Sequence, residues 1–300
     1  MEETFQMLGE LPPAEIAQKL REIGDDEAAE FYEQQAARGP SFIPEGRFIP
    51  HKWLDTAHQH GFIPLVEPGL ERYHNIISAT NMPPDASLLD QRVNIRLDWL
   101  RAYDYPRSFL NNEDNIHTIL FTFEAKNQVE GGSEPLAFNQ SYYARTGQDA
   151  AVVGHPIFIG LTIGPNGIGF AGETVNVSNS SDEQLVAAIT SEAAQSGLSL
   201  LTTAQPALTP FVSLAKKLSV SLIHRRKNVG VQRFSLGLDF DSGATGARLA
   251  IGSYVVVQAS GITWSDWCYD ADSNTICSSS DKRKMIPYNT IIFRVSKYHG

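Results

Sequence analysis

From residue 91 onward, apolar and polar residues alternate in short runs. The first run alternates four apolar with three polar side chains: Val93, Asn94, Ile95, Arg96, Leu97, Asp98 and Trp99. Because successive side chains of a strand point to opposite faces, this period of two predicts a half-buried β-strand. A chain built from such runs must pair them into sheets before it can bury its apolar faces.

Runs of similar character follow at 116–125, 136–144, 155–163, 168–177, 231–240, 253–259, 262–268 and 290–298. Glycine, proline, asparagine and aspartate separate them, and Gly164-Pro165-Asn166-Gly167 is typical of a tight hairpin turn. The spacing predicts a mainly β fold, an antiparallel β-sandwich over residues 91–300. Helices do not alternate with the strands, which argues against a parallel nucleotide-binding sheet.

A helical insertion is predicted at about 182–223, beginning at a cap formed by residues 180–183. Between residues 184 and 215 its only charged residue is Glu192. It either covers an edge of the sandwich or enters a membrane after a trigger. In the membrane hypothesis the headgroup contacts are Lys216, Lys217, Arg225, Arg226 and Lys227.

An acidic helical hairpin is predicted at 1–36. Prolines at positions 12 and 13 suit a helix start, Gly24 ends the first helix, and Asp25 or Asp26 can cap the second. Residues 1–35 carry ten acids and two bases, so most of the net charge of −10 belongs to this segment. The hairpin either packs on the sandwich or serves as a removable docking element.

A strapped, irregular segment is predicted at 37–90, because prolines recur there among many apolar residues. Within it a short helix over 51–60 would place His51, Asp55 and His58 on one face, with His60 nearby. Two imidazoles and a carboxylate can bind a transition metal. A solvated or hydrogen-bonded helix face is the alternative.

Two other polar clusters have a structural and a chemical interpretation. Asp270, Asp272 and Asn274 resemble the start of a calcium loop, although an Asx-rich turn explains them as well. The neighbouring Cys268 and Cys277 could face each other across a hairpin. The compartment expected from the sequence is the cytoplasm, where two inert thiols are favoured over a disulfide. Whether calcium binds and whether the cysteines are bridged stay open.

No catalytic signature stands out. The glycines at 164–169 have strand-like residues on both sides, whereas a phosphate loop leads from a strand into a helix. Neither a Gly-x-Ser-x-Gly elbow nor a His-Glu-x-x-His motif occurs. The net charge of −10 argues against nonspecific nucleic-acid binding.

Four stretches give the chain a fold-level resemblance: 127–128, 156–158, 229–240 and 286–289. Through them residues 91–298 resemble uncharacterised bacterial β-sandwich proteins, and also C2-type sandwiches with a helical insertion. The resemblance implies a fold and no activity.

The function predicted first is a non-catalytic binding or effector module that captures a protein partner, the partner being basic. Its contacts are assigned to six acids of the hairpin: Glu15, Glu22, Asp25, Asp26, Glu27 and Glu30. A membrane-active effector and a metal-dependent enzyme using His51, Asp55, His58 or His60 are the alternatives. No cofactor is expected, and the oligomeric state is left open.

Overall fold

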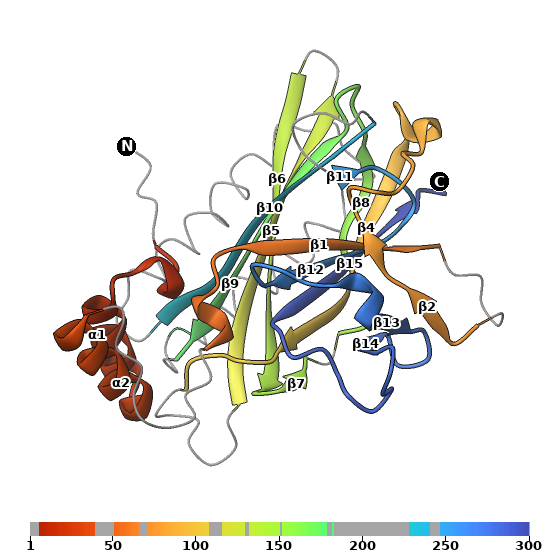
Figure 1. The fold of residues 1–300 in the computed structure, drawn as a ribbon. Coiled ribbons are helices and arrows are strands. Elements are labelled where there is room, and N and C mark those ends of the chain that lie inside the picture. The colour runs from red at the N-terminus through yellow and green to blue at the C-terminus, as the bar shows by residue number, and fades with distance from the viewer. Residues whose placement is uncertain are drawn as a thin grey trace.

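The structure, a computed structural model, describes residues 6–39, 51–65, 71–107, 116–129, 132–150, 152–178, 182, 228–240 and 247–299. It is mainly β with an N-terminal helical hairpin, as the sequence predicts (Figure 1). The described strands form sheets of seven, five and three strands. Their pairings are antiparallel, except that β11 runs parallel to β10.

The seven-stranded sheet contains β3 (Ile77–Ser78), β1 (His58–Pro64), β12 (Gly252–Gln258), β15 (Thr290–Lys297), β4 (Arg92–Ala102), β7 (Gln148–Asp149) and β8 (His155–Thr162). The five-stranded sheet has the order β11 (Ala247–Arg248), β10 (Asn228–Asp239), β9 (Ile168–Val177), β5 (Ile116–Val129) and β6 (Gly132–Arg145). The three-stranded sheet has the order β14 (Thr275–Ser278), β13 (Trp267–Asp270) and β2 (Tyr73–Asn75). Short 3-10 turns are η1 (Leu8–Glu10), η2 (Lys52–Leu54), η3 (Ala86–Leu88) and η6 (Trp264–Asp266).

The seven-stranded sheet is the middle layer, because its two faces bury different apolar sets. On β12, Tyr254 and Val256 belong to the main core shared with the five-stranded sheet. Val255 and Val257 belong to a second core shared with the three-stranded sheet. The alternation of a strand therefore distributes one apolar run between two cores.

A β-bulge on β4 changes the predicted arrangement of the first alternating run. Leu97 pairs with Phe293 and Trp99 pairs with Ile292, so Asp98 is the extra residue. Leu97 consequently lies in the main core and Trp99 in the second core. The prediction that both face the same side is wrong, because one inserted residue reverses the alternation. Asp98 is buried and accepts a hydrogen bond from Nε of Arg294 at 2.7 Å.

The predicted turn at 164–167 forms, but the strands that it joins do not pair as a hairpin. Gly164 and Gly167 make an isolated antiparallel bridge, and Gly167 has a φ of 73°. β8 then pairs with β4 in the middle sheet, whereas β9 enters the five-stranded sheet. The turn therefore connects two layers of the molecule.

The helical hairpin consists of α1 (Pro13–Ile23) and α2 (Asp26–Arg38). Gly24 ends α1 in the left-handed conformation, and Asp25 caps α2 by accepting a hydrogen bond from the amide of Ala28. The apolar faces of both helices belong to the main core. The hairpin therefore shares a core with the sheets, which favours the alternative in which it packs on the sandwich.

The predicted helix over 51–60 is also wrong. Residues 52–54 form the single turn η2, and β1 begins at His58. β1 pairs with β12 along its whole length, from His58 opposite Gln258 to Pro64 opposite Gly252. A segment expected to be irregular thus supplies a strand of the middle sheet. The predicted strand at 262–268 is interrupted as well, because η6 precedes β13.

Apart from Asp182, the predicted helical insertion at about 182–223 lies outside the described residues, as do the five cations assigned to membrane contact. In the part of the chain that the structure describes, no helix is long and apolar enough to cross a membrane.

Candidate functional site

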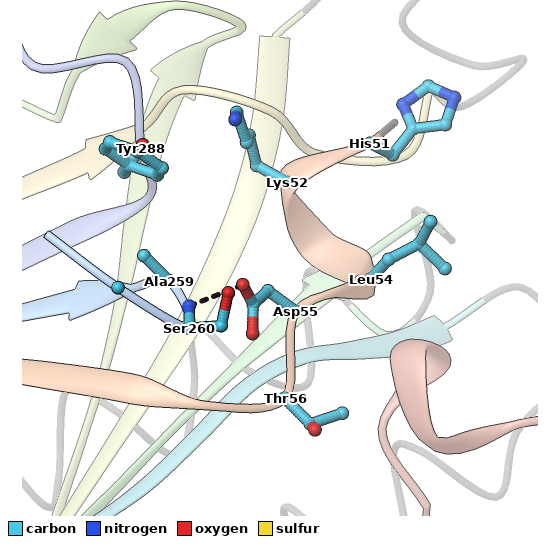
Figure 2. Close-up of a pocket in the computed structure, with 9 residues that line it drawn as sticks. His51, Lys52, Leu54, Asp55, Thr56, Ala259, Ser260 and Tyr288 are labelled. Atoms are coloured by element: carbon cyan, nitrogen blue, oxygen red, sulfur yellow. Dashed lines mark hydrogen bonds between the residues drawn. The ribbon is translucent and has the colours of Figure 1, made fainter. Parts of the chain in front are cut away.

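A pocket of about 430 Å³ opens where η2, the start of β1 and the end of β12 meet. Its lining comes from both ends of the chain and consists of His51, Lys52, Leu54, Asp55, Thr56, Ala259, Ser260, Gly261 and Tyr288 (Figure 2). The pairing of β1 with β12 brings these segments together, because it aligns His58 with Gln258. The volume lies in the range of small-molecule and side-chain pockets.

Lys52 and Tyr288 form one wall of the pocket. The Lys52 ammonium lies 4.7 Å from the centroid of the Tyr288 ring, in the geometry of a cation–π contact (Figure 2). Leu54 and Ala259 add apolar surface nearby. This wall therefore offers a flat ring and one positive charge to an incoming group.

The Asp55 carboxylate fastens the opposite wall. One oxygen accepts a hydrogen bond from the amide of Ala57 at 3.1 Å, and the other accepts one from the amide of Ser260 at 2.6 Å (Figure 2). Gln59 in turn donates to the Ser260 carbonyl at 3.1 Å. Both Asp55 oxygens therefore bind backbone amides. The side chain holds the segment before β1 next to Ser260 and so forms one side of the pocket.

His51 links the pocket to the helical hairpin. Its Nδ1 lies 3.3 Å from a carboxylate oxygen of Asp104, and its ring stacks on Trp53 with centroids 4.9 Å apart. The Trp53 ring then lies 5.7 Å from that of Tyr32 on α2. The pocket and the hairpin are neighbours through this row of rings.

The four residues predicted to hold a metal do not form a common site. His51 pairs with Asp104 and Asp55 pairs with backbone amides, while His58 and His60 lie on one face of β1. Within the described ranges, no group of three or more His, Cys, Asp and Glu side chains could hold a metal ion. The helix face on which the metal hypothesis depended is absent, because these residues form a turn and a strand.

His58 and His60 are instead half-buried residues of the middle sheet, and the Nε2 atom of each ring is buried. The His58 ring lies 5.9 Å from Phe234 of β10. Burial lowers the pKa of His58 to about 4, with a smaller contribution from the neighbouring His60. Burial also lowers the pKa of His60 to about 4. Both rings are therefore neutral at pH 7.

The six acids predicted to bind a partner divide into two groups. Asp25 is buried, with only 6% of its surface exposed, and accepts hydrogen bonds from the amides of Ala28 and Arg107. It cannot contact a partner, so that assignment is wrong. The other five are exposed or half-buried on the outer side of the hairpin: Glu15, Glu22, Asp26, Glu27 and Glu30.

Part of this acidic charge is paired within the hairpin. Arg21 binds Asp26 at 2.8 Å and Glu33 at 3.0 Å, and Lys19 binds Glu22 at 3.3 Å. Such exposed pairs are screened and exchange readily with solvent or another cation. The outer side of the hairpin keeps an excess of carboxylates.

The aspartates of the candidate calcium loop form a guanidinium-bound turn. Asp270 accepts two hydrogen bonds from Arg72, at 3.0 and 2.8 Å, which lower the pKa of its carboxyl. Asp270 also accepts a hydrogen bond from the backbone amide of Asp272 at 3.1 Å, and this contact forms an Asx turn. Asn274 adopts a positive φ of 54° at its end. The interpretation of this segment as an Asx-rich turn accounts for these contacts.

No protein-family model, curated protein or solved structure matches the chain. The resemblance to C2-type sandwiches therefore stays a prediction.

Sequence reasoning missed the pocket residues Lys52, Tyr288, Ser260 and Gly261. No local motif marks them, because about two hundred positions separate the two halves of the lining. The pairing of the strands at 58–64 and 252–258 is the one signal that could have brought the two halves together. It requires that residues 58–64 first be recognised as a strand.

Proposed function

We propose that this protein is a non-catalytic binding module for a basic segment of a protein partner. The acidic outer side of the helical hairpin attracts the segment, and the neighbouring pocket receives one of its apolar or aromatic side chains. The observation that carries the proposal is the position of exposed carboxylates on helices that are themselves fixed to the sheets.

Pre-organisation supports this function. The main core holds the inner faces of α1 and α2, and Asp25 connects the hairpin to the amide of Arg107. A surface that is already ordered loses less conformational entropy when it binds. The hairpin therefore suits recognition better than a free acidic tail would.

The pocket supplies what charge alone lacks. Exposed charge pairs mainly raise the association rate, whereas a side chain seated in a pocket lengthens the lifetime of a complex. The pocket lies next to the hairpin through His51, Trp53 and Tyr32. One extended segment can therefore contact both.

The test uses a phage-displayed library of random peptides and the purified protein. We expect selected peptides to be rich in Lys and Arg with one aromatic or large aliphatic residue, and to bind more weakly as salt rises. Replacing four hairpin acids, Glu15→Gln, Asp26→Asn, Glu27→Gln and Glu30→Gln, should weaken binding by about tenfold or more, the loss of about 1.4 kcal/mol.

Matched variants separate the two parts of the site. A control removes four acids elsewhere, Glu71→Gln, Asp90→Asn, Glu134→Gln and Asp272→Asn, and should leave binding unchanged. Gly261→Leu places a side chain at the pocket lining, where an added Cβ meets nothing within 4 Å, and should also weaken binding. No selection of basic peptides, or equal binding by the hairpin and control variants, contradicts the proposal.

Point variants are required because deleting the hairpin would also remove residues of the main core. Leu20 and Ile23 of α1 and Tyr32 of α2 are buried in the main core. Deleting residues 1–36 would expose the surface that they cover, including Trp53. Loss of binding by that deletion would not distinguish a docking role from unfolding.

A further inference from the structure

Cys268 and Cys277 face each other on neighbouring strands of the three-stranded sheet. They are directly opposite in the pairing of β13 with β14, and their Sγ atoms lie 3.1 Å apart. Both are free thiols, and both side chains are buried. The two sulfurs are therefore placed to react with each other without a change in strand register.

Lys282 distinguishes the two thiols. Its Nζ lies 2.9 Å from Sγ of Cys268 and 4.7 Å from the centroid of the Tyr73 ring. The contact with Cys268 raises the pKa of Lys282, whereas burial raises the pKa of the Cys277 thiol to about 12. An ammonium beside a sulfur favours the thiolate, which is the reactive form of cysteine. Cys268 is consequently the thiol prepared for attack.

The surroundings of the pair allow a small reagent to approach. β14 is the outermost strand of the three-stranded sheet, and only the short segment 284–286 pairs with its outer side, through Ser278 to Lys284 and Ile286 to Ile276. Lys282 beside Cys268 is exposed, and a short pairing of this kind opens locally more readily than central strands. Asp270 also faces this region, and its carboxylate is bound by Arg72.

We propose that Cys268 and Cys277 form a reversible redox centre that a peroxide converts to an intramolecular disulfide. The Cys268 thiolate attacks one oxygen of hydrogen peroxide, the O–O bond breaks, and hydroxide leaves, taking a proton to become water. Cys268 is now a sulfenic acid. Sγ of Cys277 attacks the Cys268 sulfur, forming the S–S bond and releasing the sulfenic oxygen as hydroxide, which the Cys277 proton turns into water. Two thiols lose two electrons to one peroxide, and two waters form.

The disulfide would fasten the strands that cover the second core. Tyr269 of β13 and Ile276 of β14 lie in that core with Trp99 and Ile292 of the middle sheet. A cross-link between the two strands limits their separation in every opened state of the sheet. Oxidation therefore stabilises this cover, and reduction releases it.

The experiment treats the folded full-length protein with equimolar hydrogen peroxide and follows its intact mass and its peptide map. We expect the loss of two hydrogen atoms, one peptide pair linked through Cys268 and Cys277, and full reversal by dithiothreitol. In Cys277→Ser a sulfenic-acid trap such as dimedone should label Cys268. In Cys268→Ser the trap should leave Cys277 unlabelled.

Lys282 provides a second, independent readout. Lys282→Gln should slow disulfide formation by about tenfold, because it removes the ammonium that contacts the attacking sulfur. Lys282→Arg should restore much of the rate, and Lys284→Gln, a change of the same kind in the same loop, should not alter it. The proposal is overturned if both thiols stay unreacted in the folded protein but react after denaturation. Oxidation of either thiol beyond sulfenic acid without the disulfide overturns it too.

Discussion

The buried carboxylate of Asp25 accepts a hydrogen bond from the backbone amide of Arg107 at 2.9 Å. Its other oxygen accepts the amide of Ala28 at 3.4 Å and so caps α2. One side chain thus starts a helix and joins it to a segment eighty-two positions away. This double use explains why an acid of the hairpin is unable to serve a partner.

Replacing Asp25 with alanine should lower the free energy of unfolding by about 2 kcal/mol. The loss combines a missing helix cap with an unsatisfied amide at Arg107. Asp25→Asn, which keeps an oxygen acceptor, should cost less. Asp26→Ala, at the exposed neighbouring position, should change stability by no more than about 0.5 kcal/mol. Urea denaturation followed by tryptophan fluorescence measures all three; equal effects of the alanine variants at 25 and 26 would refute the double role.

Tyr32 should be a stability determinant through its ring and not through its hydroxyl. The side chain is 1% exposed, and within the described residues its oxygen is buried without a hydrogen-bond partner. Tyr32→Ala should cost about 3 kcal/mol or more, because it leaves a cavity against Trp53. Tyr32→Phe should be neutral or stabilising. A single calorimetric transition in each variant would show that the hairpin unfolds with the sheets, whereas a separate early transition would contradict the shared core.

Stability should fall as the pH drops from about 7.5 to about 5.5. Burial lowers the pKa of His58, His60 and His117 from 6.5 to about 4 in the folded protein. Below pH 6.5 the unfolded chain therefore binds protons that the folded chain excludes, and folding loses free energy until the pH nears 4. Above pH 6.5 the three histidines are neutral in both states, and the folded state loses no free energy through them.

Thermal melts between pH 5.5 and 7.5 measure the effect. This pH range lies above the pKa of ordinary carboxyl groups, so their titration does not contribute. Between pH 7.5 and 5.5 each histidine accounts for about 1.4 kcal/mol at most, because the range ends about one unit below its unfolded pKa. His60→Gln removes one titrating group and should make the melting temperature less dependent on pH. An unchanged pH dependence in that variant would show that His60 is protonated equally in both states.

Gly167→Ala should be strongly destabilising. The residue has a φ of 73°, and an added Cβ would clash with the carbonyl oxygen of Leu238. Positive φ and a backbone clash together cost about 3 kcal/mol or more. Gly169→Ala is the matched control, since its Cβ would meet nothing within 4 Å. Chemical denaturation of both variants tests the turn, and comparable stability of the two would argue against this path between the sheets.

Local signals predicted several elements correctly. The prolines, Gly24 and Asp25 mark the hairpin, because a helix start, a left-handed helix end and a cap each need particular residues at one position. The long strands β5, β9, β10 and β15 follow from alternation and turn residues in the same way.

Non-local features were beyond such signals. The residues at 51–60 have polar spacing that suits a helix face, yet β12 supplies a partner that makes 58–64 a strand. Asp98 looks like an ordinary polar position of an alternating strand, but the register against Phe293 and Ile292 makes it a bulge. The pocket depends on the same long-range pairing, since Asp55 reaches Ser260 only after β1 and β12 have joined.

By itself, the amino-acid sequence determined the mainly β composition, the acidic hairpin and the proximity of two cysteines across a turn. These depend on backbone propensity, side-chain period and neighbours a few residues apart. The tertiary structure decided which sheet each strand enters, which acids stay exposed, and that Lys282 meets Cys268. Those outcomes depend on contacts between distant segments, whose energies arise only when the layers pack.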